Sequence, residues 1–484
     1  MSHNSKKNII SGILLCVLVF FAAGNYLLRP LWFDEALTVQ NFALLDSLES
    51  IYFNYVIPNN QLLYTMMLHL WIKAAPPFCA FDDWMRLLSL LLGAVTMVYA
   101  YRRFRVPFGS GVMAAVLITF CCAPPFLLHG TALRGYMAGA CFTLLALGAA
   151  LDFTAKGNFS SWLRYFLFSL CSVAVLPSDM LALGGVVLYA LPLCGKNFWK
   201  NKRFYLLGLT PFLGAALVYL PIFPQLLQVI KVGSNESWNA PGRVFMAVTL
   251  VTLFSFAMFL LPASAALLAF RRKGFNKRRF FRATIWLLPA IPIFLFPSPP
   301  FPRVFFPLFP LFALLVAAGV RDYTAIYCRL KKRFNKRSWI AGLLILALSW
   351  CCVQQQSEIK LLFSKFCGDA GRDDFYFPYY LRSAHLPDTT AQQISAEPSL
   401  RDCRAFYFTF NADPWPLMFY LRLSGKSCEF LFDGPRGMVQ ELPAHTVVIL
   451  NATEDQTALA RRFRGEWNFL FKNANHQVWS YNNL

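Results

Sequence analysis

Residues 9–36 read IISGILLCVLVFFAAGNYLLRPLWFDEA, an apolar segment followed directly by an acidic pair, and this segment indicates the class of protein. A transmembrane helix needs about 20 apolar residues, and residues 9–28 supply them behind Lys6-Lys7. A signal peptide would have a shorter apolar core and a small-residue cleavage site. Ala22-Ala23-Gly24 matches such a site only weakly. We therefore expect a retained first membrane helix, with Asp34-Glu35 just outside it.

On the C-terminal side of this segment, long apolar stretches recur between short polar loops. Of the 484 residues, 57% are hydrophobic, 17% aromatic and only 14% charged, which excludes an ordinary soluble domain for most of the chain. We predict an α-helical polytopic membrane protein with about 11 spans, or 12–13 in the alternative count. The expected spans are 9–28, 85–101, 108–123, 133–153, 161–177, 180–195, 204–222, 243–270, 283–297, 304–320 and 338–353.

The net charge of +21 is unevenly distributed along the chain. From Gln354 onward, 13 Lys and Arg stand against 14 Asp and Glu, so the first 353 residues contain the other 32 of the 45 basic residues and 10 of the 24 acidic ones. With the N-terminus in the cytoplasm, 25 of those 32 basic residues fall on the cytoplasmic side, as the positive-inside rule requires. The charge therefore indicates orientation in an inner or plasma membrane, and no nucleic-acid partner is expected.

Residues 61–72 are apolar, but they make up only about half of a membrane span. If they crossed the membrane, every later loop would change sides unless a further crossing compensated, and the charge asymmetry would be lost. We therefore expect a helix that dips into the membrane or lies on its surface. This topology makes residues 29–84 an external loop of the membrane domain.

Residues 354–484 differ from the membrane domain, residues 1–353. Short apolar runs bounded by turns alternate with helical stretches near 414–423 and 455–463, which predicts a small extracytoplasmic α/β domain. It contains no glycine-rich phosphate loop, HExxH motif or serine elbow, so we expect no independent chemistry there. We expect Cys403 and Cys428 to form a disulfide if the domain faces an oxidising compartment.

The acidic pair Asp34-Glu35 is the candidate catalytic motif. It belongs to a cluster of six acids between Arg29 and Met85, which contains most of the acids of the first 353 residues. A carboxylate kept at the membrane surface by Trp32-Phe33 can serve as a general base or as a metal ligand. Alternatively, Asp34 caps a helix that begins at this point. The residues alone leave both interpretations open.

A neutral polar group, Asn59-Asn60-Gln61, directly precedes the apolar residues Leu62-Leu63-Tyr64. Side-chain amides at this position can cap the helix that follows. They can equally form hydrogen bonds with a sugar or a phosphate. Both roles stay open on the sequence alone.

Three arginines lie near the expected outer surface: Arg86, Arg134 and Arg303. Arginine can extend towards lipid headgroups from such positions, or its guanidinium can bind a phosphate in a bidentate manner. External cations are scarce in this topology, which favours phosphate binding for Arg134 and Arg303. For Arg86, pairing with the nearby Asp82-Asp83 is favoured instead.

The order of these motifs resembles that of the GT-C glycosyltransferases, specifically the protein O-mannosyltransferase and lipid A aminoarabinose transferase group (glycosyltransferase family 39). The resemblance covers roughly residues 9–330 and depends on five short elements. They are Leu31–Ala36, Asn59–Tyr64, Arg86-Leu87-Leu88-Ser89, Arg134-Gly135-Tyr136 and Arg303–Pro310. Many relatives have His-Pro-Pro or Lys-Pro-Pro where this chain has Asn60-Gln61-Leu62. This difference shifts phosphate binding onto Arg134 or Arg303.

The resemblance implies an inverting hexosyl- or pentosyltransferase that uses a polyprenyl-phosphate-linked sugar and a protein, lipid or glycan acceptor at the outer membrane face. Asp34 would be the general base, and Glu35 would orient the acceptor or assist a divalent cation, with both as the metal ligands if there is one. Arg134 and Arg303 would neutralise the leaving phosphate. The residues expected to contact substrate are Asn59, Asn60, Gln61, Tyr64, Arg86 and Tyr136.

Two other classes of protein compete with this interpretation. A multi-pass transporter or flippase for a lipid-linked or anionic substrate usually has ionisable groups deep in the membrane. Here Asp152 and Asp179 lie at the ends of expected spans, and the two halves show no clear repeat. An inactive scaffold that binds partners through its external domain would tolerate Asp34→Asn.

Overall fold

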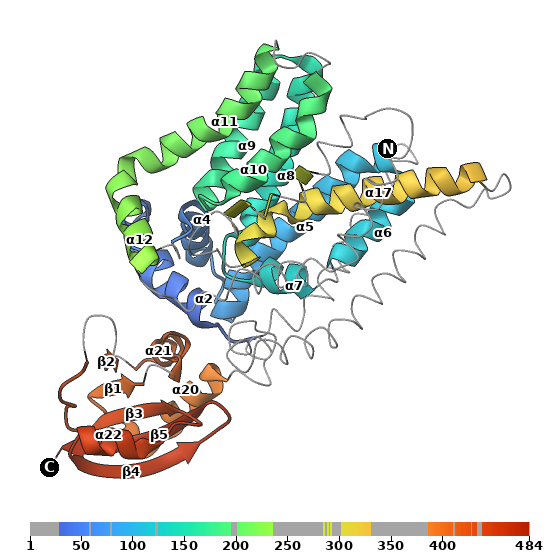
Figure 1. Ribbon diagram of the computed structural model, residues 1–484. Coiled ribbons are helices and arrows are strands. Elements are labelled where there is room, and N and C mark those ends of the chain that lie inside the picture. The colour runs from blue at the N-terminus through green and yellow to red at the C-terminus, as the bar shows by residue number, and fades with distance from the viewer. Residues whose placement is uncertain are drawn as a thin grey trace. The chain divides into compact units, whose positions relative to one another are not determined.

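The computed structural model contains two compact units (Figure 1). The helical unit consists of Met1–Gly24, Asp46–Cys79 and Trp84–Phe375, and the sheet unit of Asn25–Leu45, Ala80–Asp83 and Tyr376–Leu484. The described residues are 29–57, 60–77, 80–121, 124–194, 201–235, 284–285, 288–289, 291–292, 302–330, 386–409, 412–426, 428–432 and 438–483.

Four helical segments among the described residues are long and apolar enough to cross a membrane: Phe81–Phe108, Tyr136–Lys156, Lys202–Val229 and Arg303–Arg321. They coincide with or overlap the expected spans 85–101, 133–153, 204–222 and 304–320. The expected spans 9–28, 243–270, 338–353 and most of 283–297 lie outside the described residues. The count of 11 spans and the domain boundary at residue 353 therefore stay predictions.

The elements of the helical unit follow one another closely in sequence. They are α3 (Leu48–Phe53), α4 (Leu62–Lys73), α5 (Phe81–Phe108), α6 (Ser110–Cys121), α7 (Pro124–Thr131), α8 (Tyr136–Lys156), α9 (Phe159–Val175), α10 (Asp179–Ala190), η2 (Leu191–Cys194), α11 (Lys202–Tyr219), η4 (Leu220–Ile222), α12 (Phe223–Asn235), η6 (Pro302–Leu308) and α17 (Phe309–Leu330). Helix α5 begins with three residues that belong to the sheet unit.

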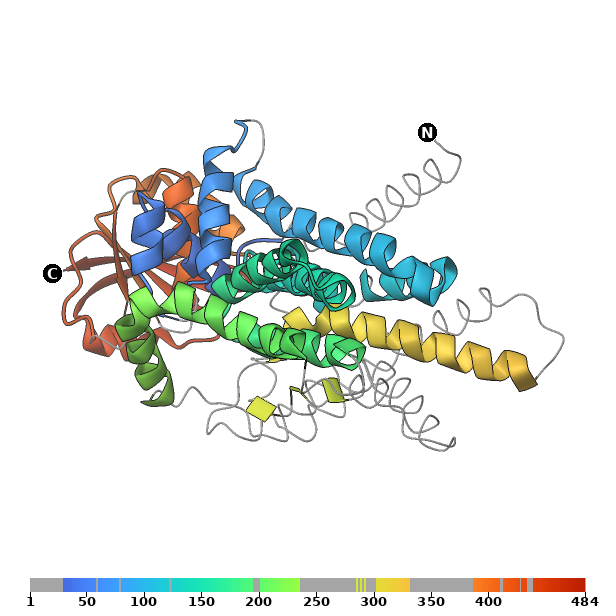
Figure 2. The ribbon, with the colours of Figure 1, turned by 90° about the horizontal axis from the view of Figure 1, so that it is seen from above.

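Helix α8 is the centre of the helical unit, and α9, α10, η6 and α17 pack against it (Figure 2). Small side chains permit this close packing, as they do between membrane helices generally. A Cβ atom added at Gly139 would collide with the Asp179 carboxylate, and one added at Gly148 would collide with the Tyr99 hydroxyl. These two glycines therefore set the approach of the neighbouring helices to α8.

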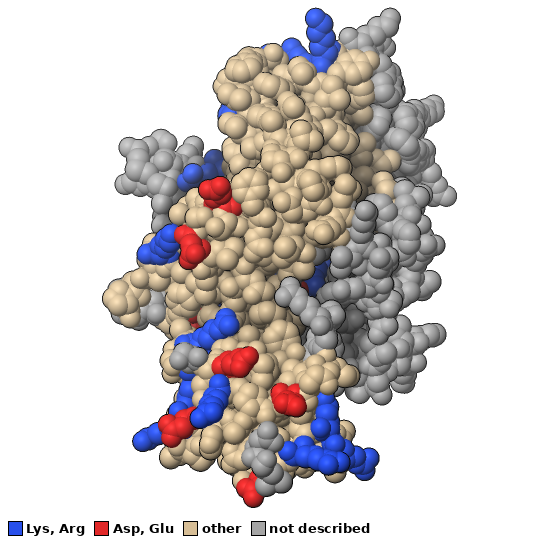
Figure 3. All heavy atoms as spheres, turned by 90° about the vertical axis from the view of Figure 1, so that its left-hand side faces the viewer, with Lys and Arg blue, Asp and Glu red and all other residues tan. Residues whose placement is uncertain are grey.

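Helix α11 exposes an apolar face. Leu209, Phe212 and Leu217 of this helix are 63%, 66% and 56% exposed. Figure 3 shows a broad area without charged side chains on the side of the molecule where α11 lies in Figure 1. An uncharged, apolar helix face of this size is typical of contact with lipid.

Helix α4 corresponds to the apolar segment 61–72. Its 12 residues are about 18 Å long, well short of the roughly 30 Å of hydrocarbon in a bilayer. This length favours the expected helix that dips into the membrane or lies on it.

The sheet unit contains a five-stranded mixed sheet, as expected for a small α/β domain. Its strands are β1 (Ala405–Phe408), β2 (Glu429–Phe432), β3 (Thr446–Asn451), β4 (Gly465–Lys472) and β5 (His476–Asn483), in the order β2-β1-β3-β5-β4. Strand β1 is parallel to β2 and β3, and β5 is antiparallel to β3 and β4. The helices are α2 (Phe33–Thr38) with η1 (Val39–Ala43), α20 (Pro387–Ala396), η7 (Pro398–Leu400), α21 (Pro414–Leu423) and α22 (Gln456–Arg462).

Helix α21 connects the parallel strands β1 and β2, as a crossover between parallel strands requires. The expected helices near 414–423 and 455–463 are therefore confirmed as α21 and α22. Buried apolar side chains form a core for this unit: Tyr407, Leu442, Val448, Leu450, Phe463 and Tyr481.

Candidate active site

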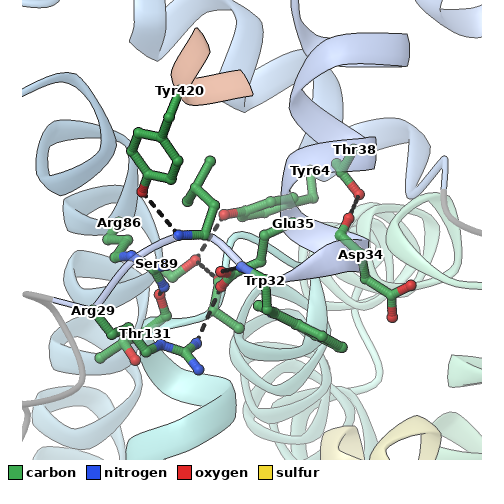
Figure 4. A network of polar contacts seen from close by, with 12 residues as sticks. Arg29, Trp32, Asp34, Glu35, Thr38, Tyr64, Arg86, Ser89, Thr131 and Tyr420 are labelled. Atoms are coloured by element: carbon green, nitrogen blue, oxygen red, sulfur yellow. Dashed lines mark hydrogen bonds and ion pairs between the residues drawn. The ribbon is translucent and has the colours of Figure 1, made fainter. Parts of the chain in front are cut away.

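The two acids of the Asp34-Glu35 motif lie in the first turn of α2 and have different surroundings. Glu35 is fully buried, and its Oε1 lies 3.1 Å from Nη2 of Arg29, whose side chain is also buried (Figure 4). Its Oε2 accepts a hydrogen bond from the Trp32 backbone N–H at 3.2 Å. One oxygen of Glu35 thus forms an internal ion pair, and the other accepts a hydrogen bond from the backbone at the start of the helix.

Asp34 does not cap α2, so the helix-cap interpretation of this residue is wrong. The N-cap residue is Trp32, and Glu35 provides the carboxylate that accepts its N–H. Asp34 is 8% exposed, and Figure 4 shows its carboxylate pointing away from the Arg29–Glu35 pair. Consecutive residues of a helix point in directions about 100° apart, which explains why the two acids separate.

Helix α2 is fixed to α21 of the sheet unit by hydrogen bonds at both of its ends. The Leu31 N–H donates to the Tyr420 hydroxyl at 2.9 Å, and this hydroxyl donates to Asp82 Oδ2 at 2.9 Å. Beyond the helix, Gln40 Nε2 donates to the Trp415 carbonyl at 2.9 Å. No feature of the local sequence predicted that the acidic motif would pack against this domain.

In the helical unit, the Arg134-Gly135-Tyr136 motif lies at the start of α8. The Arg134 side chain is buried, with its guanidinium carbon 5.7 Å from the centre of the Tyr136 ring. The Gly135 N–H donates to Gln61 Oε1. A Cβ atom at Gly135 would collide with Val175, so only glycine fits at this position without a shift.

Several residues expected to contact substrate lie around the segment 131–135 that precedes α8, as Figure 4 shows for Tyr64 and Arg86. Arg86 Nη1 lies 3.4 Å from the Thr131 carbonyl, and Ser89 Oγ donates to the Ala132 carbonyl at 2.7 Å. The Tyr64 hydroxyl lies 2.7 Å from Ser89 Oγ. Together with Gln61, these side chains position the backbone that carries Arg134.

Asn60 also has an internal role. Its Nδ2 donates to the carbonyls of Ile51 and Asn54 at 2.8 and 3.0 Å, which stabilises the loop before α4. The N-cap residue of α4 is Gln61, whose side chain forms no cap hydrogen bond, so the helix-capping interpretation is wrong for Gln61. Asn59 lies outside the described residues.

Arg303 lies near the start of η6 and is partly exposed. Element η6 packs against α8 and α10. The His129 ring connects the two arginine-bearing segments, because its centre lies 5.2 Å from the Tyr136 ring and 5.4 Å from the Phe306 ring. The motifs that contain Arg134 and Arg303 are therefore neighbours in the fold.

The acidic pair does not fit a divalent cation site. In the described part of the chain, no group of three or more His, Cys, Asp or Glu residues is arranged to hold a metal ion. Glu35 already uses one oxygen for Arg29 and the other for the Trp32 N–H.

Comparison with known proteins gives structural but no sequence matches. No family model and no curated protein matches this chain. ArnT from Cupriavidus metallidurans bound to undecaprenyl phosphate is 13% identical, with a TM-score of 0.59, over 98% of this chain and 97% of that one. The Archaeoglobus fulgidus oligosaccharyltransferase with Zn and sulfate is 12% identical, with a TM-score of 0.54, over 98% and 73%. Both have the GT-C fold of glycosyltransferases.

The chain has a GT-C fold. This confirms the expected polytopic helical membrane architecture with a small C-terminal sheet. A third GT-C structure, AglB from A. fulgidus in complex with an inhibitory peptide and a dolichol-phosphate, is 11% identical over 100% of this chain and 75% of that one, with a TM-score of 0.50. At these identities the likeness to solved structures establishes the fold alone.

Proposed function

We propose that this chain is an integral membrane glycosyltransferase that moves a sugar from a polyprenyl-phosphate-linked donor to an acceptor at the outer membrane face, with inversion. The observation that carries the proposal is the different environment of the two acids in the motif. Glu35 is neutralised by Arg29, while the neighbouring Asp34 carboxylate points away from that pair. The undecaprenyl phosphate bound to ArnT and the dolichol-phosphate bound to AglB support a donor of this class.

Asp34 is the proposed general base. Its carboxylate takes the proton of an acceptor hydroxyl or amine while the acceptor atom attacks the anomeric carbon of the sugar. The bond between that carbon and the phosphate oxygen breaks, and its electron pair leaves with the polyprenyl phosphate. Attack on the face opposite the leaving group inverts the configuration. Glu35 is proposed to support the geometry of α2 and not to contact the acceptor.

Arg134 and Arg303 are the proposed phosphate-binding residues. A guanidinium group donates two parallel hydrogen bonds to phosphate oxygens and stabilises the charge that develops as the sugar leaves. The proposal is supported by the packing of η6 against α8, which brings the two motifs together, and by the glycine that permits the tight start of α8.

Direct substrate contact by Asn59, Asn60, Gln61, Tyr64, Arg86 and Tyr136 stays a prediction. For Asn60, Gln61, Tyr64 and Arg86 the internal contacts favour a positioning role. The proposed setting is an inner or plasma membrane, with the N-terminus in the cytoplasm and the C-terminal domain outside. The donor sugar is a hexose or a pentose, and the acceptor is a protein, a lipid or a glycan.

The test compares cells with and without the gene by mass analysis of surface glycans, glycoproteins and lipids. We expect one glycosylated species to disappear without the gene and to return with the wild-type chain. Asp34→Asn should not restore it, whereas Asp46→Asn, at an exposed acid of the external segment, should. An unchanged set of glycans and lipids, or full restoration by a membrane-inserted Asp34→Asn protein, would contradict the proposal.

A further inference from the structure

Asp413 has an unusual backbone conformation at the end of the loop between β1 and α21. Its φ of +49° and ψ of +69° place it in the left-handed region, in the N-cap position of α21. Among the described residues, only one other non-glycine residue, His445, has a positive φ. Such conformations persist where the surrounding structure enforces them, and they are concentrated at functional sites.

The Asp413 side chain does not form the hydrogen bond that an N-cap residue usually makes with its helix. Its Oδ1 is shielded from solvent and accepts no hydrogen bond from the described residues, although the residue as a whole keeps some exposure. Burial, and then the negative charge of Asp34, raise the pKa of Asp413 to about 7. Close like charges make the second ionisation of a carboxylate pair unfavourable. Asp413 is thus near enough to the proposed base to interact with it.

The packing of α2 against α21 explains this proximity. Asp34 lies in the sequence between Leu31 and Gln40. Leu31 and Gln40 each form a hydrogen bond with a residue of α21, so the segment that carries Asp34 is attached to α21 before and after this residue. Asp413 lies directly before α21, two residues from Trp415, which accepts the bond from Gln40. Around these packed elements, the other charged or titratable groups of the described residues include the Arg29–Glu35 ion pair, Asp82, Asp388, Tyr420, Arg422 and His476.

We propose that Asp413 is a positioning residue for the transfer reaction, which acts through Asp34 by making that carboxylate a stronger base. This inference depends on the proposed function of Asp34. When both carboxylates are ionised, they repel each other, and a proton bound to either one relieves this repulsion. The acceptor gives its proton to Asp34 while its oxygen or nitrogen bonds to the anomeric carbon. The C-terminal part of the chain, expected from sequence to be without chemistry of its own, would then act on the proposed base within the sheet unit.

The first test measures the interaction without using activity. Infrared titration of the full-length protein follows the protonated carboxyl signal in the wild type, Asp34→Asn and Asp413→Asn. We expect a signal that titrates near pH 7 in the wild type, is absent in Asp413→Asn and titrates at lower pH in Asp34→Asn. An Asp34→Asn protein with the wild-type titration would overturn the pairing, whether or not the chain is a transferase.

The second test measures the pH dependence of kcat/KM for sugar transfer. Activity in the wild type should rise with pH through about 7, because the pair must lose a proton before Asp34 can accept one. In Asp413→Asn this rise should move down by two pH units or more, towards the value of an isolated carboxyl group at about 4, and kcat at neutral pH should fall about tenfold or more. An unshifted profile would overturn the proposal.

Two further variants separate this role from folding. Asparagine tolerates the left-handed conformation better than most residues, so Asp413→Asn should fold, and Asp413→Glu should keep the rise near pH 7. Asp402→Asn, at an exposed acid of the same unit, should match the wild type in both tests. If the wild-type chain transfers no sugar, the proposed function fails, while the infrared titration still decides whether Asp34 and Asp413 interact.

Discussion

Arg29 and Glu35 form an ion pair with Nη2 and Oε1 3.1 Å apart and with side chains only 1% and 0% exposed. The pair links the residue that follows the first expected span to the helix that carries Asp34. Two charges removed from water in this way depend on each other, because each would be costly to bury alone. Glu35 is therefore the structural acid of the motif, paired with Arg29, and Asp34 is the proposed catalytic acid.

Replacing Glu35 by Gln should destabilise the protein, because the buried Arg29 would lose the counter-charge that Glu35 provides. We expect a loss of about 3–5 kcal/mol, seen as a lower thermal unfolding midpoint of the detergent-solubilised protein. Glu49→Gln, at an exposed acid, is the matched control and should have no effect. The double variant Arg29→Met, Glu35→Leu should regain most of the loss; equal instability of the double variant would contradict this account.

Asp34→Asn should have the opposite profile, with lost activity and retained stability. Loss of a general base lowers the rate about 10²- to 10⁴-fold, and we expect a decrease of this size in kcat for sugar transfer. The unfolding midpoint should stay close to that of the wild type, because the Arg29–Glu35 pair and the Glu35 contact to Trp32 are unchanged. Wild-type kcat in this variant would remove Asp34 from the mechanism.

Gly135→Ala should disturb the segment that carries Arg134. The new methyl group would collide with Val175 and press on Gln61 and Tyr64, an overpacking that costs about 1–3 kcal/mol. We expect lower thermal stability and a raised KM for the lipid-linked donor. Gly184→Ala is the control, since nothing lies within 4 Å of its added Cβ. Val175→Ala should partly rescue Gly135→Ala, and a lack of any rescue would indicate another cause.

Arg134→Lys and Arg303→Lys should each weaken donor binding although the charge is retained. A lysine ammonium cannot reproduce the planar bidentate contact of a guanidinium with phosphate. We expect the donor KM to rise by about 10- to 100-fold, as for loss of about 1.5–3 kcal/mol from a charged hydrogen bond. Arg401→Lys, at an exposed arginine of the sheet unit, should leave KM unchanged. If KM is also unchanged in the first two variants, neither arginine binds the donor phosphate.

Cys403 and Cys428 should form a disulfide if the sheet unit faces an oxidising compartment, as the expected topology requires. Their sulfur atoms lie 3.2 Å apart, and the two cysteines come just before the paired strands β1 and β2. Maleimide labelling of the denatured, unreduced protein should modify neither thiol, and both should react after reduction. Cys428→Ser should release a reactive Cys403. Labelling of both thiols without a reductant would contradict the disulfide and the external placement of this unit.

The sequence was sufficient for the class of fold and for the individual elements. Apolar length identifies membrane helices such as α8, and alternating short strands and helices identify the α/β unit, because both are properties of neighbouring residues. The resemblance to the GT-C glycosyltransferases was also visible from the order of short motifs. The internal contacts of Gln61, Tyr64 and Arg86 could not be predicted from the sequence, because the hydrogen-bond partner of a polar side chain is set only by the folded structure.

The amino-acid sequence by itself determined that this is a membrane protein with a helical core, a terminal α/β unit and an acidic motif after its first apolar segment. Only the tertiary structure decided which acid of that motif is neutralised and which residues accompany the other. The physical reason is distance along the chain. The hydrogen bond from Leu31 to Tyr420 joins residues 389 positions apart, and the same packing brings Asp413 near Asp34. Contacts of this range depend on how whole elements pack, and local sequence carries no record of them.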